Sequence, residues 1–369
     1  MRLVGEAELE DIAVGAAILG TGGGGDPYIG KLLAQEAVRR YGPVEMVSVD
    51  EVSDDAFVVP SAMMGAPTVM VEKLPRGSEV INAFEALGQY MGRTPTHTTS
   101  IEAGGLNSTT PFVVAAQLGI PLVDADGMGR AFPEIQMIIA TMHGVSATPM
   151  TLADEKGNSA VIHTIDNSWT ERLARTLTVD FGATAMIALY PMSGEQLKAG
   201  AFVAGTISLA EELGKLVRAT RAAHGNPIGA VVERLGARRL FGGKVVDVAR
   251  RTEAGWAKAE VRIEGSLEYA GSSLVLQIQN EHLVAVRDGE VVCSVPDLIV
   301  VMDAENGGPI TTEELRYGFR VVVIGAPCVP DWRTERGLEL VGPRYFGYDI
   351  DFVPVEERFA PWATSNSRT

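Results

Sequence analysis

The sequence predicts an α/β N-terminal domain followed by a β-rich α+β C-terminal domain. The chain has 369 residues, more than one typical domain holds, and 46% of them are hydrophobic, enough for a sizeable core. Helical periodicity alternates with short apolar runs up to about residue 165, and alternating strand-type segments dominate thereafter. We therefore divide the chain into domains at 1–165 and 166–369.

The first domain has the rhythm of a layered α/β fold. From residue 97 onward, a strand, a glycine-containing turn, a helix and a second strand predict a right-handed crossover. Its strand ends would bring Glu102 and Asp124 to one edge of the sheet, where α/β sites usually lie. The full pattern predicts helices over 6–20, 28–40, 78–91 and 111–118 and strands over 43–49, 56–59, 97–102 and 121–124.

The second domain begins with helical patterns over 167–178 and 206–223. Short alternating segments bounded by turn residues follow, which is typical of antiparallel strands. The predicted strands are 243–249, 257–263, 273–279, 282–286, 290–293, 297–302 and 319–324.

Charge and composition exclude several classes of partner. The formal net charge of −16 would repel phosphate backbones and anionic lipid surfaces, so we expect neither nucleic acid nor membrane as a partner. The first residues are acidic, and no apolar run approaches the roughly 20 residues that span a bilayer. We expect a cytoplasmic protein with its two cysteines reduced. A homo-oligomer remains open.

A run of four glycines lies between Gly20 and Asp26. Such a run costs backbone entropy that a simple turn does not require, so we predict that Gly23, Gly24 and Asp26 contact a substrate. A dinucleotide fingerprint needs a preceding strand, and here a helix precedes, so we expect no nucleotide cofactor. The alternative is a helix C-cap followed by a flexible loop.

Glu102 stands just before a loop of small and polar residues that contains Asn107. The loop leads into a helix N-terminus, and an amide that both donates and accepts can grip a carboxylate or a cyclic amide. We predict a catalytic role for Glu102 and a substrate-binding role for Asn107. The hydroxyls after Asn107 could instead serve only to cap the helix.

Asp124 and Asp126 follow a short apolar strand, with Arg130 close behind. Neighbouring carboxylates can divide the roles of activating water and protonating a leaving group, so we predict both as catalytic. Arg130 is predicted to bind substrate. The alternative is an aspartate turn with an arginine ion pair.

Cys328 follows the predicted strand 319–324 in a loop where a thiol can be exposed, which makes it a candidate nucleophile. Arg333 is the local cation that could lower its pKa. A packed, structural thiol is the alternative, and Cys293, inside a strand-like run, is expected in the core. The five histidines show no tight metal-binding spacing, so the metal ligands are unknown, and a divalent metal such as zinc stays open as a cofactor.

Five long motifs stand out along the chain: GTGGGGDPYIG, EAGGLNSTTP, VDADGMGRAFPE, ATPMTLADEKGN and WRTERGLELVGPRYFGYDIDFVPV. Together they resemble the S-methyl thiohydantoin desulfurase family. The resemblance extends from about residue 8 to 355. It implies a hydrolase that removes sulfur, as methanethiol or sulfide, from a thiohydantoin ring to give a hydantoin in ergothioneine-type degradation.

Two other hypotheses remain. The first is hydrolysis of hydantoin or of oxoproline-like cyclic amides. The second, from a different class, is a non-catalytic partner subunit of a hydantoinase, which would carry a large exposed apolar patch in place of a closed polar pocket.

Overall fold

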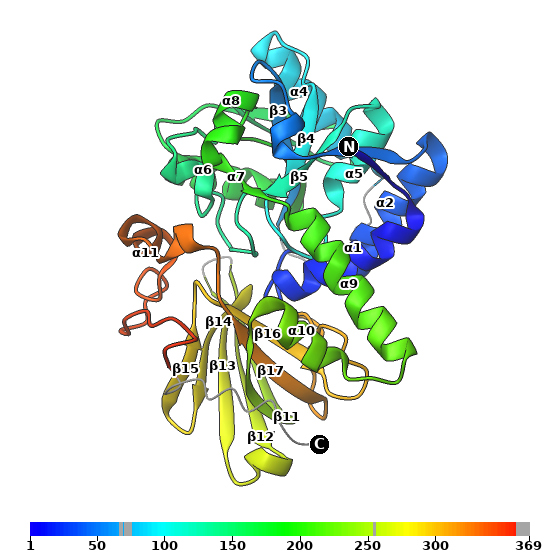
Figure 1. The fold of residues 1–369 in the computed structure, drawn as a ribbon. Coiled ribbons are helices and arrows are strands. Elements are labelled where there is room, and N and C mark those ends of the chain that lie inside the picture. The colour runs from blue at the N-terminus through cyan, green and yellow to red at the C-terminus, as the bar shows by residue number, and fades with distance from the viewer. Residues whose placement is uncertain (66–68, 70–75, 254–255, 359–369) are drawn as a thin grey trace.

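The computed structural model describes residues 1–65, 69, 76–253 and 256–358 and contains two domains, each built on its own sheet. Figure 1 shows the N-terminal α/β domain above and the β-rich C-terminal domain below. The predicted fold class is confirmed. None of the described helices is both long and apolar enough to cross a membrane.

The first sheet is mixed, with parallel strands at its centre. Its main path runs β1-β2-β5-β4-β3-β8-β6-β7; β2, β5, β4 and β3 are parallel and the outer pairings are antiparallel. The strands are β1 (Arg2–Val4), β2 (Val44–Val47), β3 (Phe57–Gly65), β4 (His97–Ser100), β5 (Leu122–Asp126), β6 (Met150–Ala153), β7 (Ser159–Ile162) and β8 (Thr184–Ala188), with the short β9 (Met192–Ser193) and β10 (Val203–Ala204) beside β3 and β5.

Helices pack around this sheet. They are α1 (Glu6–Leu19), α2 (Pro27–Tyr41), α4 (Ser78–Met91), α5 (Thr110–Leu118), α6 (Ile139–Met142), α7 (Asn167–Asp180), α8 (Gly194–Gln196) and α9 (Thr206–Ala222). Glycines let α1 and α9 approach closely: a Cβ on Gly15 would lie 1.7 Å from the carbonyl oxygen of Ala210, and one on Gly214 would lie 1.9 Å from that of Asp11. This contact fixes the long helix α9 against the start of the chain.

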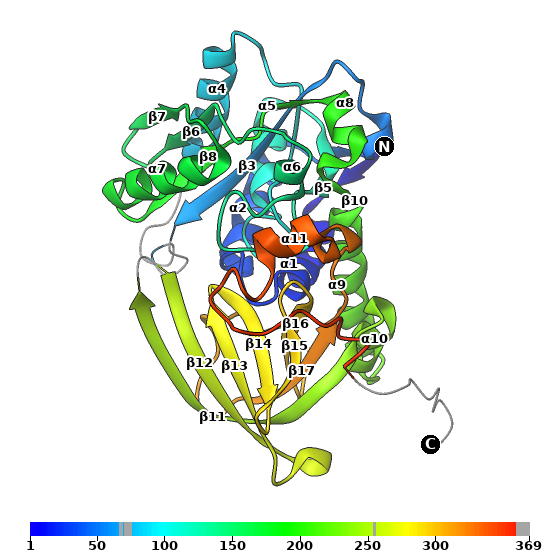
Figure 2. The ribbon, with the colours of Figure 1, turned by 90° about the vertical axis from the view of Figure 1, so that its left-hand side faces the viewer.

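The second sheet is antiparallel and curled, as Figure 2 shows. Its order is β15-β14-β13-β12-β11-β17-β16. The strands are β11 (Arg238–Glu253), β12 (Trp256–Gly265), β13 (Ser273–Gln279), β14 (Glu281–Arg287), β15 (Glu290–Ser294), β16 (Leu298–Asp303) and β17 (Arg320–Ala326), flanked by α10 (Pro227–Leu235) and α11 (Glu335–Val341). Alternate side chains of β13 are buried, which is the period expected of a strand with one face on a core.

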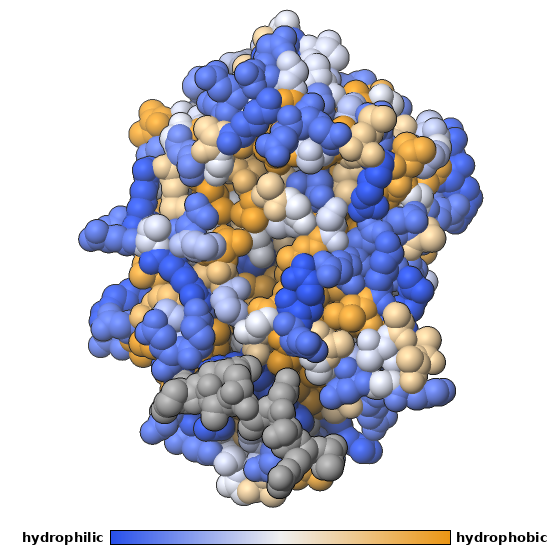
Figure 3. Space-filling model, in the orientation of Figure 1, coloured by the Kyte–Doolittle hydropathy of each residue, from blue (hydrophilic) through white to orange (hydrophobic). Residues whose placement is uncertain are grey.

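The hydrophobic core is continuous between the domains. One cluster of buried residues includes side chains of the first sheet, of α9 and of the second sheet. On the surface, Figure 3 shows apolar residues interspersed with polar ones across the visible face. The division at 165/166 stays a prediction; α7 and β8 to β10 belong with the first sheet, and the second sheet begins at Arg238.

The predicted crossover is present. Strand β4, helix α5 and strand β5 follow one another, and the two strands are parallel neighbours. Strand β4 ends at Ser100, two residues earlier than predicted, so Glu102 lies in the loop that follows the strand. This loop and the loop after β5 emerge at the same edge of the sheet, which faces the second domain.

Candidate active site between the two domains

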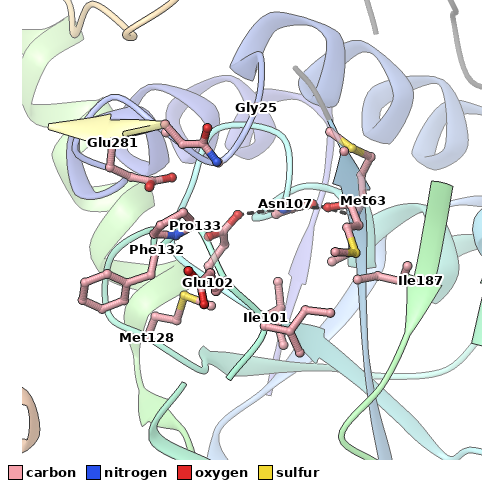
Figure 4. A pocket seen from close by; sticks show the side chains of 18 of the residues that line it. Gly25, Met63, Ile101, Glu102, Asn107, Met128, Phe132, Pro133, Ile187 and Glu281 are labelled. Carbon is pink, nitrogen blue, oxygen red and sulfur yellow. Dashed lines mark hydrogen bonds between the residues drawn. The ribbon is translucent and has the colours of Figure 1, made fainter. Parts of the chain in front are cut away.

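A cavity opens where the first sheet's loops meet the second domain (Figure 4). It encloses about 690 Å³ of empty space, counting the solvent at its mouth. The first domain contributes the glycine run, Glu102, Asn107 and an apolar wall, and the second domain contributes Asn280, Glu281 and Glu313. An apolar hollow with a few convergent polar groups is typical of a small-molecule site. The apolar lining consists of Ala62, Met63, Met64, Ile101, Met128, Phe132, Pro133, Ile135, Ile187 and Leu189.

The glycine run forms one side of the cavity. Gly24 and Gly25 have φ of 82° and 84°, a backbone region that favours glycine. A Cβ on Gly24 would lie 2.3 Å from the Cα of Gly104, so only glycine allows the two loops to touch. The Gly24 carbonyl accepts hydrogen bonds from the N–H groups of Leu106 at 2.8 Å and Asn107 at 3.2 Å. The loops predicted separately from the sequence therefore form one unit.

The second domain holds the same run from the other side. The N–H of His282 donates to the Thr21 carbonyl at 2.9 Å, and the N–H of Thr312 donates to the Gly22 carbonyl, also at 2.9 Å. A Cβ on Gly23 would lie 2.1 Å from Oε1 of Glu281. Gly23 thus leaves the space that the Glu281 carboxyl occupies. Both domains are needed to build this side of the cavity.

Glu102 is buried and points into the cavity (Figure 4). Its Oε1 accepts a hydrogen bond from Nδ2 of Asn107 at 2.7 Å. The amide of Asn107 also pairs with the backbone of Met63, accepting from its N–H at 2.8 Å and donating to its carbonyl at 3.2 Å. Asn107 thus lines the cavity, but its amide groups are bonded to the protein and position Glu102, so its predicted role in substrate binding stays a prediction.

The pKa of Glu102 is raised to about 7, chiefly because burial disfavours the charged carboxylate. Hydrogen bonds from Asn107 and from the backbone of Phe132 act in the opposite direction, and the nearby Asp126 adds a further increase. A carboxyl with this pKa can take up and release a proton near neutral pH, which is what a general base or acid must do.

Glu281 is the second buried carboxyl of the cavity. Only 2% of the residue is exposed, and its Oε2 has no hydrogen-bond partner within the described chain. Its pKa lies well above the ordinary value, first because of burial and then because of repulsion from Glu102, with Arg130 acting in the opposite direction. Burial and the neighbouring Glu102 carboxyl therefore both favour the protonated form of Glu281.

Glu134 and Glu313 also line the cavity. Oε2 of Glu134 accepts a hydrogen bond from the Tyr345 hydroxyl at 2.8 Å, which ties the cavity wall to the C-terminal segment. Burial raises the pKa of Glu313, whose Oε2 accepts from the Thr312 hydroxyl at 3.2 Å. The site is thus rich in carboxyl groups, while much of its remaining lining is apolar.

The structure places Asp124 outside the cavity lining. Its carboxylate accepts from the N–H of Ser208 at 3.0 Å and from the Ser208 hydroxyl at 2.5 Å. The N-cap of α9 is Gly205, which has no side chain to offer, so Asp124 supplies the missing acceptor from β5. Its predicted catalytic role stays a prediction, and its observed contacts are those of a helix cap.

Asp126 is buried and also lies outside the cavity lining. Its carboxylate accepts from the N–H groups of Met128 at 2.9 Å and of Gly129 at 2.8 Å, which shapes the turn after β5. Burial raises its pKa to about 6 against the effect of these hydrogen bonds. Asp126 therefore influences Glu102 through its charge and shapes the turn, and its predicted catalytic role stays a prediction.

Two of the predicted substrate-binding residues contact protein groups instead. Asp26 caps α2, accepting from the N–H groups of Tyr28 at 2.8 Å and Ile29 at 3.1 Å. Arg130 is fully buried and donates to the carbonyls of Pro296 at 2.8 Å and Asp297 at 2.9 Å. Within the described residues, Arg130 does not form the ion pair with a neighbouring aspartate that the alternative interpretation expected, and its guanidinium joins the two domains.

The prediction that the Cys328 thiol is exposed is wrong. The residue is 7% exposed, lies outside the cavity lining, and donates its N–H to Oδ1 of Asp297 at 3.0 Å. Burial, followed by the negative charge of Asp297, raises the pKa of the thiol to about 12 although Arg333 acts in the opposite direction. A nucleophilic thiolate needs the reverse shift. Cys293 is buried in β15, as expected.

No group of three or more His, Cys, Asp or Glu side chains is arranged to hold a metal ion in the part of the chain that the structure describes. The predicted divalent metal thus stays a prediction without an assigned site.

Glu281 and Glu313 are not among the predicted site residues, because no feature of the neighbouring sequence relates them to Glu102. One signal was present: Glu281 stands at the head of the buried run of β14, where a charged residue is unusual. Asn280 before it has φ of 58°, a turn conformation that aims the start of the strand at the glycine run.

Comparison with known protein families shows to which family the chain belongs. The model of the S-Me-THD-like N-terminal domain matches residues 7–164, and that of the S-Me-THD-like C-terminal domain matches residues 165–355. The chain belongs to the S-Me-THD-like family. A crystal structure of a protein from Chromobacterium violaceum resembles this S-Me-THD-like protein with a TM-score of 0.76 and 26% identity, covering 96% of this chain and 100% of the other. No curated protein sequence matches the S-Me-THD-like protein.

Proposed function

We propose that the protein is a hydrolase that removes sulfur from a thiohydantoin ring, as methanethiol from the S-methyl form or as sulfide from the free thione, and leaves a hydantoin. Membership of the S-Me-THD-like family supports the ring class. The observation that carries the proposal is Glu102, a carboxyl with a pKa of about 7 that is held in a cavity between the domains.

Water is the nucleophile in this reaction. Ionised Glu102 accepts one proton of the water as its oxygen bonds to C2 of the ring, and the electron pair of the C2–N double bond moves to the nitrogen. The C2–S bond then breaks, and Glu102 passes its proton to the departing sulfur. The second water proton ends on the ring nitrogen, so one water and one S-methyl thiohydantoin give one hydantoin and one methanethiol.

The glycine run offers groups that would stabilise the charge developing on the ring. Gly24 and Gly25 line the cavity, and their N–H groups donate no hydrogen bond within the described chain. Free N–H groups that are fixed before the reaction can hold a developing negative charge without reorganisation. The positive φ of both residues keeps the backbone in this form, which explains why glycine stands at both positions.

The apolar wall suits the rest of the reaction. Ile101, Met128 and Ile187 line the cavity, and Ile101 and Met128 lie beside Glu102 (Figure 4). They would exclude bulk water from the ring and provide a surface for a thioether substituent. The low polarity of this wall also contributes to the burial that raises the pKa of Glu102.

The test is the release of thiol, measured with a disulfide reagent, alongside chromatography of the ring product. With S-methyl thiohydantoin as substrate, we expect methanethiol and hydantoin in equal amounts. Ring opening of plain hydantoin without thiol release from the thiohydantoin would instead support the cyclic-amide hydrolase. No reaction with either ring would count against both enzymes and favour the partner-subunit hypothesis.

A further inference from the structure

Glu281 has a chemical feature that the proposed reaction does not use. It is a buried carboxyl that lines the cavity and makes no ion pair in the described chain. Its Oε2 is buried without a hydrogen-bond partner. A buried polar atom without a partner is destabilising, so a ligand that supplies the missing hydrogen bond is bound more tightly.

The surroundings of Glu281 favour its neutral form. Glu102 and Glu313 place further carboxyl groups near it, and the single opposing charge that acts strongly is Arg130. Arg130 directs its hydrogen bonds to Thr21 and to backbone carbonyls, and it donates none to Glu281. An unpaired buried carboxylate would be costly, whereas a protonated carboxyl needs only ordinary hydrogen bonds.

A protonated carboxyl presents a donor and an acceptor on the same side. A ring amide presents the complementary pair, because the ring holds its N–H and C=O in the cis arrangement. An open-chain secondary amide is trans, so its N–H and C=O point in opposite directions and cannot both meet one carboxyl.

We infer that Glu281 acts as a neutral carboxylic acid that recognises the cis-amide edge of a cyclic substrate through two parallel hydrogen bonds. This inference rests on the proposed function, since it assumes that the cavity takes a ring of the hydantoin class. It makes Glu281 the residue that selects cyclic over open-chain amides. Glu102 lies beside Glu281 in the cavity (Figure 4), so a ring held in this way is presented to the base.

Gly23 supports this role by leaving room for the carboxyl. A Cβ at this position would lie 2.1 Å from Oε1 of Glu281, and even the smallest side chain would push the carboxyl out of place. The other three glycines of the run have a positive φ, but Gly23 does not. Glycine is therefore needed at this position because a side chain would not fit, and not because of the backbone conformation. The Gly23→Ala variant therefore displaces Glu281 without removing it.

Glu281→Gln is the decisive variant, because an amide side chain also carries a donor and an acceptor on one side but cannot ionise. Binding of unreactive probes is measured by calorimetry and ligand-observed NMR, with 2-pyrrolidone and hydantoin as cyclic probes and N-methylacetamide as the open-chain probe. We expect Glu281→Gln to bind the cyclic probes within about threefold of the wild type. Glu281→Leu and Gly23→Ala should bind them at least about tenfold more weakly, a loss of about 1.4 kcal/mol.

Glu290→Gln is the matched control, since it makes the same substitution at an exposed residue of the second domain outside the cavity lining and should leave binding unchanged. The inference fails if Glu281→Gln loses as much binding as Glu281→Leu, if Glu281→Leu binds normally, or if N-methylacetamide binds as well as 2-pyrrolidone. If Glu281→Leu does not fold, the comparison of Gly23→Ala with Glu281→Gln still tests whether the Glu281 carboxyl binds the cyclic probes. The binding test measures no turnover, so it is independent of the thiol-release assay. If the probes bind as expected but no thiol is released, the proposed reaction is contradicted while this inference holds.

Discussion

Nδ2 of Asn107 donates to Oε1 of Glu102 at 2.7 Å, and the same amide is locked onto the backbone of Met63 in β3. The amide thus connects the base to a central strand of the first sheet. This connection holds Glu102 in one orientation and partly offsets the effect of burial on its pKa. The role of Asn107 is therefore positional, and its loss has consequences that can be measured.

Replacing Asn107 with alanine should raise the pKa of Glu102 further, because a hydrogen bond to the carboxylate is lost. The acidic limb of the kcat/KM profile should move to higher pH. We expect kcat/KM at pH 7 to fall by about 10- to 100-fold, with part of the loss recovered at higher pH. Asn158→Ala is the control, since Asn158 bonds to Asp154 outside the cavity. A uniform loss without a shift of the profile would contradict this role.

The raised pKa of Glu102 also predicts a dependence of stability on pH. Because the folded-state pKa of about 7 exceeds the ordinary 4.5, the folded state binds more protons than the unfolded state between these values. The contribution of Glu102 to stability is thus fully present below about pH 4.5 and is lost as the pH rises through 7.

Glu102→Gln removes this titration. We expect the variant to be more stable than the wild type at pH 8, by up to about 3 kcal/mol, and the difference to vanish near pH 4. Denaturant unfolding at several pH values measures it, and the comparison is repeated in a Glu281→Gln background because the Glu281 carboxyl is coupled to Glu102. A difference that is independent of pH, or largest at acidic pH, would show that Glu102 does not titrate in this way.

Cys328→Ala should keep kcat within about threefold of the wild type, because a buried thiol with a pKa of about 12 supplies almost no thiolate near neutral pH. Cys293→Ala, another buried thiol, serves as the control for packing. Alkylation of the native protein should be slow and insensitive to substrate. A Cys328→Ala variant that folds normally but has no turnover would restore the covalent route.

Asp124→Ala should lower stability by about 1 kcal/mol, the usual cost of a lost helix cap, and change kcat little. Asp124→Asn keeps an acceptor for the Ser208 N–H and should be milder in both measurements. Thermal unfolding and steady-state kinetics on the two variants separate the alternatives. A loss of kcat of about 100-fold in both variants, with stability unchanged, would identify Asp124 as catalytic.

The sequence carries much of the fold because the fold depends on local periodicity. The helix over 78–91 and the crossover through α5 follow from patterns within one or two turns or strands, and the structure has them. Strands β6 and β7 are missing from the predicted pattern, because Thr151 interrupts one segment and Ser159 begins the other, so that neither forms a continuous apolar run.

The site was harder to predict because it joins distant parts of the chain. Glu102, Asn107 and the glycine run could be identified, since small and polar residues interrupt regular elements there. Glu281 could not, because its meeting with Gly23 depends on how the second domain docks. The burial of Cys328 could not be predicted from its neighbours in sequence either. The residue follows a strand in a segment that reads as an exposed loop, yet in the fold it is buried and its N–H is bonded to Asp297.

The most direct test of the proposed chemistry compares methanethiol release from S-methyl thiohydantoin by the wild type and by Glu102→Gln between pH 5 and 9. For the wild type we expect kcat/KM to rise with pH through an apparent pKa of about 7, as Glu102 ionises. The glutamine variant should lose at least about 100-fold in kcat and show no such limb, while still binding hydantoin. Normal turnover by a folded Glu102→Gln, with the wild-type pH profile, would contradict the assignment of Glu102 as the base.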